Sequence, residues 1–151
     1  MELGAPIPPL RATLADGTPL RLGDLACPVV IYFYPKDDTA GCTREAQAFS
    51  AFAQAFAAAG ASVLGISRDT PASHAKFAAK HALTVTLATD EDGSVCEAFG
   101  VWGEKSLYGR TYMGIERATF LFDGEGRLAR AWRRVRVPGH VESVLAAVQA
   151  L

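Results

Sequence analysis

The sequence has few cysteines and no long apolar run, and both absences exclude classes of protein. The three cysteines, Cys27, Cys42 and Cys96, are odd in number and widely spaced, so they do not form a disulfide framework. No stretch reaches the roughly 18 consecutive apolar residues of a membrane span. The segment Met1–Gly4 lacks the basic start of a signal peptide. We therefore expect a cytoplasmic protein that does not act at a membrane.

An excess of charge of either sign is also missing. Fifteen Lys and Arg face 16 Asp and Glu, for a net charge of −1, which gives no reason to expect nucleic acid as a partner. The local basic run is interpreted as a solvated sheet edge; it comprises Arg127, Arg130, Arg133, Arg134 and Arg136. The three histidines lack zinc-ligand spacing with the cysteines and are interpreted as surface or boundary residues, so neither a metal nor another cofactor is expected.

The length and the hydrophobic pattern predict one α/β domain over residues 1–151. Half of the residues are hydrophobic, as in a globular chain. The pattern predicts, in chain order, an N-terminal hairpin (3–22), a buried strand (29–34), a helix through Phe56 that Gly60 ends, a strand (61–67), a helix (70–81), an extended piece (85–87), a short helix with Cys96, two strands (118–122 and 128–135) and a C-terminal helix. This order indicates a thioredoxin-like fold, in which helices flank a mixed sheet and a β-hairpin precedes it.

The residue that carries chemistry in this pattern is Cys42, which falls in the first turn of the helix after the buried strand. The free N–H groups and the dipole of a helix start favour a thiolate. The hydroxyl of Thr39 can lie beside the sulfur, and Gly41 allows close approach of the backbone to a ligand. Glu45 stands where a CxxC pair needs its second cysteine, and no histidine signature of a cysteine protease is present.

Several motifs in this order resemble the peroxiredoxins, in particular the bacterioferritin-comigratory-protein (PrxQ) subfamily. The first is Pro35, Thr39, Gly41, Cys42, Thr43, Glu45 and Ala46, which is similar to the peroxidatic motif. The others are Phe33–Lys36, Val63–Ser67 with Asp69, Ser73–His74 with Lys76–Phe77, Phe99–Lys105, and Gly114–Ile115 with Arg117 and Thr119–Phe120. The resemblance covers nearly the whole chain.

The resemblance implies that Cys42 reduces hydroperoxides and becomes a sulfenic acid. It also assigns Arg117 as the active-site arginine, Thr39 as an adaptable hydroxyl and Pro35 as an apolar wall beside the sulfur. Glu45 has two interpretations of equal weight: it orients the arginine, as in the family, or it is a first-turn carboxylate that the helix dipole favours. Trp102 and Lys105 are interpreted as packing and shaping a loop.

The chain departs from the subfamily in the residues that resolve the sulfenic acid. The two positions at which relatives carry a resolving cysteine hold Gln47 and Ala78, and Ala40 replaces a common proline. Cys96 remains as a candidate resolving residue; the alternative is that Cys96, like Cys27, is a buried structural cysteine. We expect a one-cysteine mechanism in which thioredoxin, glutaredoxin or a small thiol reduces the enzyme.

We therefore expect a monomeric thiol peroxidase with a role in antioxidant defence. Two other hypotheses stay open. A peroxide-sensing switch would oxidise Cys42 once and turn over poorly, and a thioredoxin-like binding module would use no thiol chemistry. The binding module leaves the combination of Pro35, Thr39, Cys42 and Arg117 unexplained.

Overall fold

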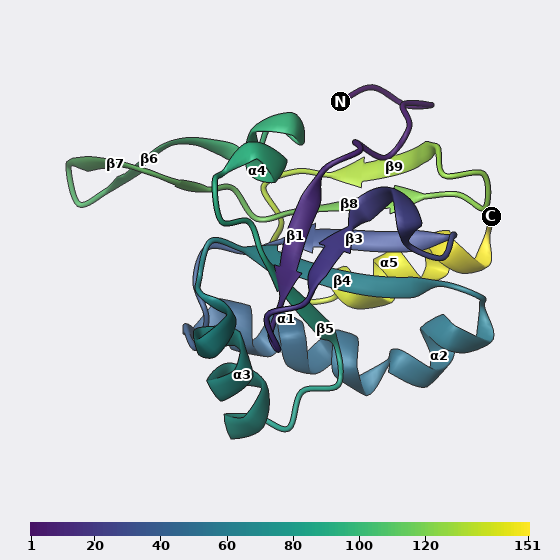
Figure 1. The fold of residues 1–151 in the computed structure, drawn as a ribbon, viewed down its shortest axis with the longest axis horizontal. Coiled ribbons are helices and arrows are strands. Elements are labelled where there is room, and N and C mark those ends of the chain that lie inside the picture. Colours follow the sequence, from purple (N-terminus) through teal and green to yellow (C-terminus); the bar gives the residue numbers. More distant parts are fainter.

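A computed structural model describes all residues, 1–151, and its centre is a seven-stranded mixed sheet in the order β2-β1-β5-β4-β3-β8-β9 (Figure 1). The three central strands β3, β4 and β5 are parallel, and the other strands pair antiparallel. The strands are β1 (Arg11–Leu14), β2 (Pro19–Arg21), β3 (Val29–Phe33), β4 (Ser62–Ser67), β5 (Thr86–Thr89), β8 (Ala118–Phe122) and β9 (Leu128–Trp132). The predicted mixed sheet and N-terminal hairpin are confirmed.

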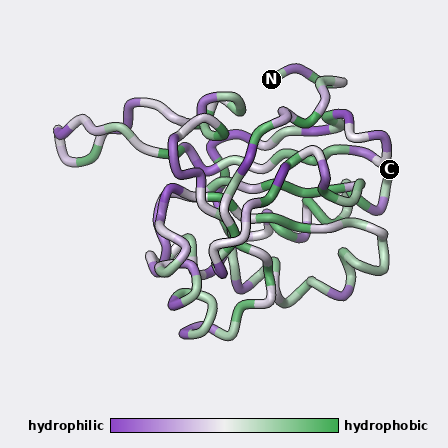
Figure 2. The backbone as a smooth tube through the Cα atoms, in the orientation of Figure 1, coloured by the Kyte–Doolittle hydropathy of each residue, from purple (hydrophilic) through white to green (hydrophobic).

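The apolar run of β3 forms the middle of the sheet because both of its faces are covered. Every residue from Val29 to Phe33 is buried, and β3 pairs with β4 on one side and β8 on the other. Figure 2 shows these central strands as a hydrophobic band inside a more polar shell. This strand ends just before the loop that leads to Cys42.

Helices cover the two faces of the sheet unequally. One face packs against α1 (Ala40–Ala51), α2 (Ala53–Ala58), α3 (Pro71–Lys80) and α5 (His140–Gln149). The other face packs against α4 (Ser94–Ala98), the 3₁₀ turn η1 (Leu22–Asp24) and the N-terminal segment. Each face has its own hydrophobic cluster, and the sheet separates the two. The longest helix has 12 residues, and none combines the length and apolar character that a membrane span requires.

Three element boundaries differ from the sequence-based prediction. The helix predicted to continue through Phe56 breaks at Phe52, whose backbone (φ −95°, ψ 10°) leaves the helical region. The last strand ends at Trp132 and not at residue 135, and the extended piece predicted at 85–87 is β5, which runs from Thr86 to Thr89. None of these shifts changes the fold class.

The interpretation of Trp102 and Lys105 as loop residues is wrong. They lie in β6 (Trp102–Leu107), which pairs with β7 (Arg110–Ile115) in a two-stranded ribbon that projects from the body (Figure 1). The ribbon has no strong hydrophobic alternation because its outer half packs on nothing, and Leu107, Tyr108, Tyr112 and Met113 are exposed. The sequence signal for this hairpin was Gly109. In the structure Tyr108 and Gly109 form its two-residue turn, and both have positive φ (50° and 75°).

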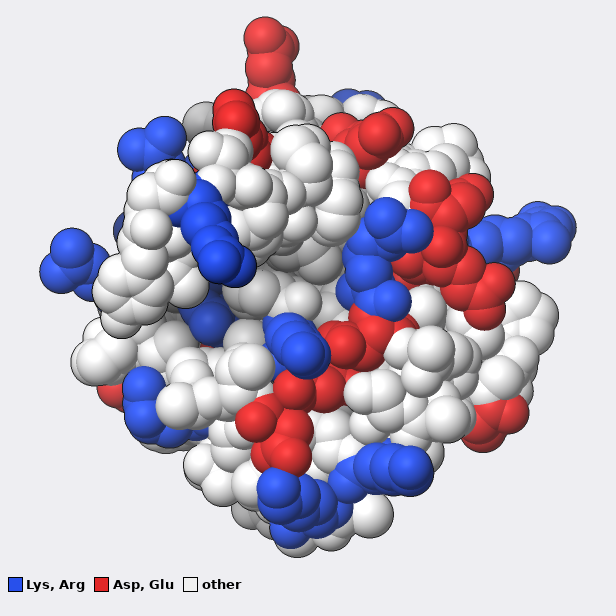
Figure 3. All heavy atoms as spheres, turned by 90° about the vertical axis from the view of Figure 1, so that its left-hand side faces the viewer, with Lys and Arg blue, Asp and Glu red and all other residues white.

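The end of the molecule that carries the ribbon shows charges of both signs. Lys and Arg alternate there with Asp and Glu around a hollow (Figure 3). Part of this pairing is the ion pair between the Arg133 guanidinium and Glu116, whose nearest N and O atoms are 2.7 Å apart. Arg130 lies on β9, which is an edge strand of the sheet as predicted.

Candidate active site

Cys42 lies in the first turn of α1, directly after the loop that leaves β3. Thr39 is the N-cap residue, with extended backbone (φ −89°, ψ 157°), and its carbonyl accepts the first helical hydrogen bond, from the N–H of Thr43. Only 1% of Cys42 is exposed. The sulfur therefore sits near the positive end of the helix, in the first turn as predicted, and it lies out of bulk solvent.

One guanidinium joins Cys42 to Glu45. Nη2 of Arg117 donates to Sγ of Cys42 at 3.3 Å, and Nη1 of Arg117 donates to Oε1 of Glu45 at 2.7 Å. Cys42 and Glu45 are three residues apart on α1, so both side chains face the same way. Burial lowers the pKa of Arg117, but the charges of Glu45 and Cys42 outweigh it and raise that pKa. The guanidinium is therefore a fixed cation on the sulfur.

Glu45 is fully buried beside Arg117. Its side chain has no exposed area and forms an ion pair with Arg117, so it is not a solvated first-turn carboxylate, and its position favours the interpretation that it orients the arginine. Desolvation raises the pKa of Glu45 to about 7, although Arg117 acts to lower it. Its second oxygen, Oε2, and the hydroxyl of Tyr32 are the two buried side-chain polar atoms without a hydrogen-bond partner.

Gly41 leaves room for the close approach of Arg117. A Cβ atom at this position would lie 3.1 Å from Nη2 and 3.8 Å from Cζ of the guanidinium. A contact of 3.1 Å is tighter than ordinary van der Waals packing, so alanine here would push against the group that holds the sulfur. The sequence predicted a close approach of a ligand to the backbone at Gly41, whereas the group that approaches Gly41 in the structure is Arg117.

Thr39 and Pro35 lie beside the group formed by Cys42, Arg117 and Glu45. The Thr39 hydroxyl donates to the carbonyl of Lys36 at 2.8 Å, so its hydrogen atom closes the loop and is not directed at the sulfur. Its oxygen keeps free lone pairs for a ligand. Pro35 and Arg117 line a surface hollow together with Lys105 of β6 and Glu116. The segment Glu104–Ser106 of β6 therefore forms one wall of the approach to Arg117.

A buried polar cluster beneath the loop was missed from the sequence. Asp37 accepts hydrogen bonds from the Tyr34 hydroxyl (2.6 Å) and the Ser73 hydroxyl (2.8 Å), and its Oδ2 lies 2.8 Å from Nδ1 of His74. Nε2 of His74 meets the carbonyl of Ala88 at 3.1 Å. Desolvation raises the pKa of Asp37, but the hydrogen bonds from His74 and Tyr34 outweigh it and lower that pKa. This cluster ties the loop before Cys42 to α3.

The interpretation of the histidines as surface or boundary residues is therefore wrong for His74 and His140, which are both buried. His140 bonds to the Thr119 hydroxyl at 2.8 Å. Polar partners from distant elements make these burials favourable, and a single sequence does not show such partners. His81 alone is near the surface, where Nε2 lies 2.7 Å from Asp38.

The other two cysteines lie far from Cys42 in the folded chain. Cys96 is on α4 and belongs to the hydrophobic cluster on the opposite face of the sheet from Cys42. Burial, followed by the hydrogen bond and charge of Asp90, raises the pKa of Cys96. Cys27 precedes β3 at the end of the strand away from Cys42, and all three thiols are free. Of the positions where relatives carry a resolving cysteine, Gln47 is exposed on α1 and Ala78 is half-buried on α3.

A thioredoxin-like fold with one buried cysteine at a helix start and an arginine on its sulfur defines a thiol-dependent oxidoreductase. Residues 3–131 match the AhpC/TSA family. Peroxiredoxin Bcp of Xanthomonas campestris pv. campestris is 46% identical over 99% of this chain and 94% of its own length. Peroxiredoxin Bcp of Bacillus subtilis is 43% identical over 96% and 93% of the two chains.

Solved structures give the same result. A cysteine-to-serine variant of Xylella fastidiosa PrxQ superposes with a TM-score of 0.92 at 39% identity, covering 99% of this chain and 96% of that one. A cysteine-to-serine variant of Xanthomonas campestris Peroxiredoxin Q gives 0.90 at 46% identity with the same coverage. The chain belongs to the AhpC/TSA family, among the Bcp/PrxQ peroxiredoxins, and it is a peroxidase.

Proposed function

We propose that Cys42 is the residue that reduces hydroperoxides, and that Arg117, Thr39, Pro35 and Gly41 form its site. The observation that carries the proposal is the hydrogen bond of 3.3 Å from Nη2 of Arg117 to Sγ of Cys42 in the first turn of α1. A guanidinium stays charged at any physiological pH, so it stabilises a thiolate at all times. Neither of the other two cysteines receives a hydrogen bond from a cation at its sulfur, although the charge of Arg68 acts on Cys96.

The reaction begins with attack of the Cys42 thiolate on the distal peroxide oxygen. The S–O bond forms as the O–O bond breaks, and the alkoxide or hydroxide leaves with the electron pair and takes up a proton. Negative charge moves from the sulfur to the leaving oxygen, so donors must face both. Arg117 has N–H groups to spare after its bonds to Cys42 and Glu45, and the Thr39 oxygen has free lone pairs to accept the peroxide O–H.

The substrates proposed are hydrogen peroxide and organic hydroperoxides. A study of the bacterioferritin comigratory protein of Xanthomonas campestris describes alkyl peroxide reduction by that protein. In the present chain the hollow beside Arg117 is lined by Pro35, Val135 and the segment Glu104–Ser106 of β6, so it offers both apolar and charged surface beside the guanidinium. An alkyl group can lie against the apolar part while the peroxide faces the guanidinium.

The sulfenic acid is resolved by an external thiol in this proposal. Cys96 lies across the sheet, and β3 alone, at about 3.3 Å per residue, places Cys27 more than about 15 Å from the Cys42 loop. A disulfide requires Cα atoms within about 7 Å. Thioredoxin, glutaredoxin or a small thiol would complete the cycle. Action as a cytoplasmic monomer is part of the proposal, since one chain supplies every site residue and all its thiols are free.

A second function is favoured by the burial of the sulfur. With 1% of Cys42 exposed, a reductant reaches the sulfenic acid only after the first turn of α1 moves. If that movement is slow, the protein is a peroxide-sensing switch that oxidises once. The two functions share the first step and differ in the second.

The number of catalytic turnovers distinguishes the peroxidase from the peroxide-sensing switch. Peroxide consumption is measured with thioredoxin and its reductase, with glutaredoxin, and with a small thiol, in large excess over enzyme. The peroxidase proposal expects many turnovers with at least one reductant. One equivalent of peroxide consumed, followed by arrest with every reductant, would leave only the switch.

A further inference from the structure

The single cation of the site faces two groups that both become anions. Arg117 donates 3.3 Å to Sγ of Cys42 and 2.7 Å to Oε1 of Glu45. Both acceptors are buried, with 1% of Cys42 and none of Glu45 exposed. If the thiolate and the carboxylate were charged together, one guanidinium would balance two buried negative charges. A buried charge without a partner is strongly unfavourable.

No second cation bonds to Cys42 or Glu45: Lys105 and Arg134 line the surface hollow beside Arg117 together with Glu104 and Glu116, and Lys105 donates to the carbonyl of Ile115. The buried titratable groups that face the site are Tyr32 from β3, Asp37 from the loop before α1, and His140 from α5. Desolvation and the charge of Arg117 lower the pKa of His140 to about 4, so this ring is neutral near pH 7. Asp37 is an anion held by His74, and Tyr32 is neutral. The positive charge of Arg117 therefore balances one buried anion and not two.

The unpartnered oxygen of Glu45 shows where the excess proton fits. Oε1 accepts from Arg117, whereas Oε2 is buried without any partner. The Tyr32 hydroxyl is the other buried orphan, and desolvation, followed by the charges of Glu45 and Cys42, raises the pKa of this phenol well above its usual value. An ionised carboxylate with a buried oxygen that accepts no hydrogen bond is strongly unfavourable. Burying the neutral, protonated carboxyl in the same place costs much less free energy. Desolvation accordingly raises the pKa of Glu45 to about 7.

We propose that Cys42 and Glu45 share one proton, so that Glu45 is a positioning residue that holds the proton on Oε2 while Cys42 is a thiolate. The proposal rests on the proposed role of Cys42. When the sulfur is oxidised its charge leaves with the alkoxide, and Glu45 then ionises and becomes the sole anion on Arg117. The guanidinium is paired in both states and need not move between them.

The atoms and electrons of this step balance. Cys42 thiolate, protonated Glu45 and ROOH give Cys42 sulfenic acid, Glu45 carboxylate and ROH. The S–O bond forms, the O–O bond breaks, sulfur is oxidised and the peroxide is reduced. The proton from Glu45 ends on the leaving oxygen by way of solvent, because Glu45 does not reach the mouth of the site. The net charge of the site is the same before and after.

The direct test is infrared difference spectroscopy of the wild-type protein near neutral pH, before and after one equivalent of hydrogen peroxide. We expect a protonated-carboxyl band in the reduced protein that disappears on oxidation while a carboxylate band grows. Mass spectrometry of the same sample shows whether Cys42 was oxidised, so a failure of the proposed function is recognised separately. Full oxidation of Cys42 with no loss of a carboxyl band would overturn the shared proton.

Proton stoichiometry in a single turnover supplies a second readout. The wild-type protein should take up almost no proton from a weakly buffered solution, because Glu45 supplies it. Glu45→Gln keeps an acceptor for Arg117 and no titratable proton, so its thiolate should take up about one proton for each sulfenic acid formed. Its thiolate absorbance near neutral pH should also rise, since a competing anion is gone. Equal uptake by the two proteins, or a smaller thiolate absorbance in Glu45→Gln, would contradict the proposal.

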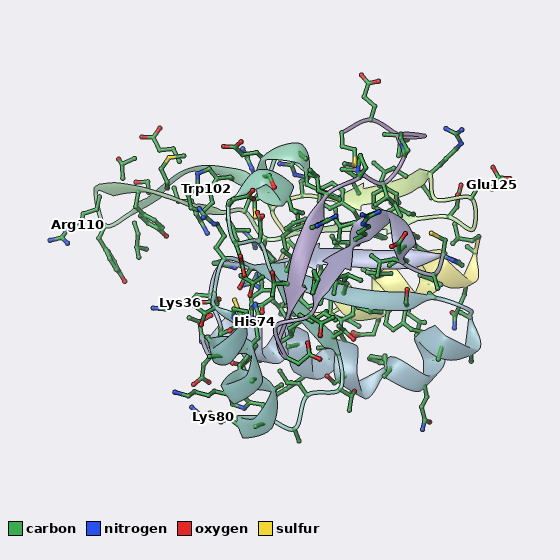
Figure 4. The ribbon with its side chains drawn as sticks, in the orientation of Figure 1. Lys36, His74, Lys80, Trp102, Arg110 and Glu125 are labelled. Carbon is green, nitrogen blue, oxygen red and sulfur yellow. The ribbon has the colours of Figure 1, made fainter.

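Glu125→Gln is the matched control. It makes the same substitution in an exposed turn at the end of the molecule away from Lys36 and the Cys42 loop (Figure 4). Its proton uptake and thiolate absorbance should equal those of the wild-type protein. If Glu45→Gln does not fold, the infrared measurement on the wild-type protein still decides the question.

Discussion

Cys42 and Cys96 are equally buried cysteines on opposite faces of one sheet, and the charged group with the strongest effect on each differs in sign, Arg117 at Cys42 and Asp90 at Cys96. Cys42 has 1% of its surface exposed and receives an N–H from Arg117. Cys96 has none exposed and lies beside Asp90, whose carboxylate accepts the N–H groups of Val95 and Cys96. We therefore expect that burial alone does not decide whether a cysteine of this fold is inert or reactive. The sign of the charge beside the sulfur distinguishes them.

Replacing each cysteine gives the largest expected contrast. Cys42→Ser removes the nucleophile, so peroxide consumption should fall to the uncatalysed level. Cys96→Ser and Cys27→Ser should undergo the first oxidation at nearly the wild-type rate. Stopped-flow fluorescence or a competition assay with a peroxide probe measures these rates. Rapid consumption by Cys42→Ser would refute the assignment.

Removing the cation should make Cys42 resemble Cys96. Arg117→Ala leaves both the sulfur and the Glu45 carboxylate without their donor, and it removes a donor from the leaving oxygen. Loss of one such donor costs about 100-fold or more in rate. The thiolate absorbance should fall as well, but by less than the rate. An unchanged rate would show that the helix start alone activates Cys42.

A smaller displacement of the same guanidinium should have a smaller effect. In Gly41→Ala the new Cβ meets Nη2 of Arg117 at 3.1 Å, so the group must shift by a few tenths of an ångström. We expect a loss of less than about tenfold in the second-order rate constant, since displacements of 1 Å cost about 100-fold. Gly23→Ala is the matched control, because nothing lies within 4 Å of its Cβ position. Equal rates for both variants would mean that Gly41 is not required for the approach of Arg117.

Changing the surroundings of Cys96 should leave catalysis intact. Asp90→Asn offers one oxygen where two backbone N–H groups now donate, so one buried N–H loses its partner at a cost of about 1–3 kcal/mol in stability. Denaturant unfolding measures this loss. The rate of peroxide reduction should not change, whereas a thiol-labelling reagent should modify Cys96 faster. A lower peroxidase rate would connect α4 to the Cys42 site in a way that the structure does not show.

The sequence was sufficient for those features that depend on neighbours along the chain. The apolar run of β3, the helix that follows it and the first-turn position of Cys42 are local, and the structure has them as predicted. The roles of distant residues came from the resemblance: Arg117 lies 75 residues from Cys42, and no periodicity brings them together. The two interpretations of Glu45 could not be separated because burial depends on the whole fold.

The features that were missed involve partners from several elements or no partners at all. His74 is buried because Asp37, Tyr34 and Ala88 come together around it from a loop, a strand end and β5. The β6–β7 ribbon was missed for the opposite reason, since it packs on little and its sequence shows no buried face. A helix or strand that covers a core leaves a periodic pattern, and these features do not.

The central claim is that the two buried cysteines act independently and that only Cys42 is oxidised by peroxide. Peptide mapping of protein treated with peroxide in the absence of added thiol tests it most directly, with a sulfenic-acid trap present. The account predicts the trap, or a sulfinic acid, on Cys42, with Cys27 and Cys96 recovered as free thiols. A stoichiometric Cys42–Cys96 disulfide that is absent in Cys96→Ser would contradict it, because the two residues could then meet only if the chain rearranged around the sheet that separates them.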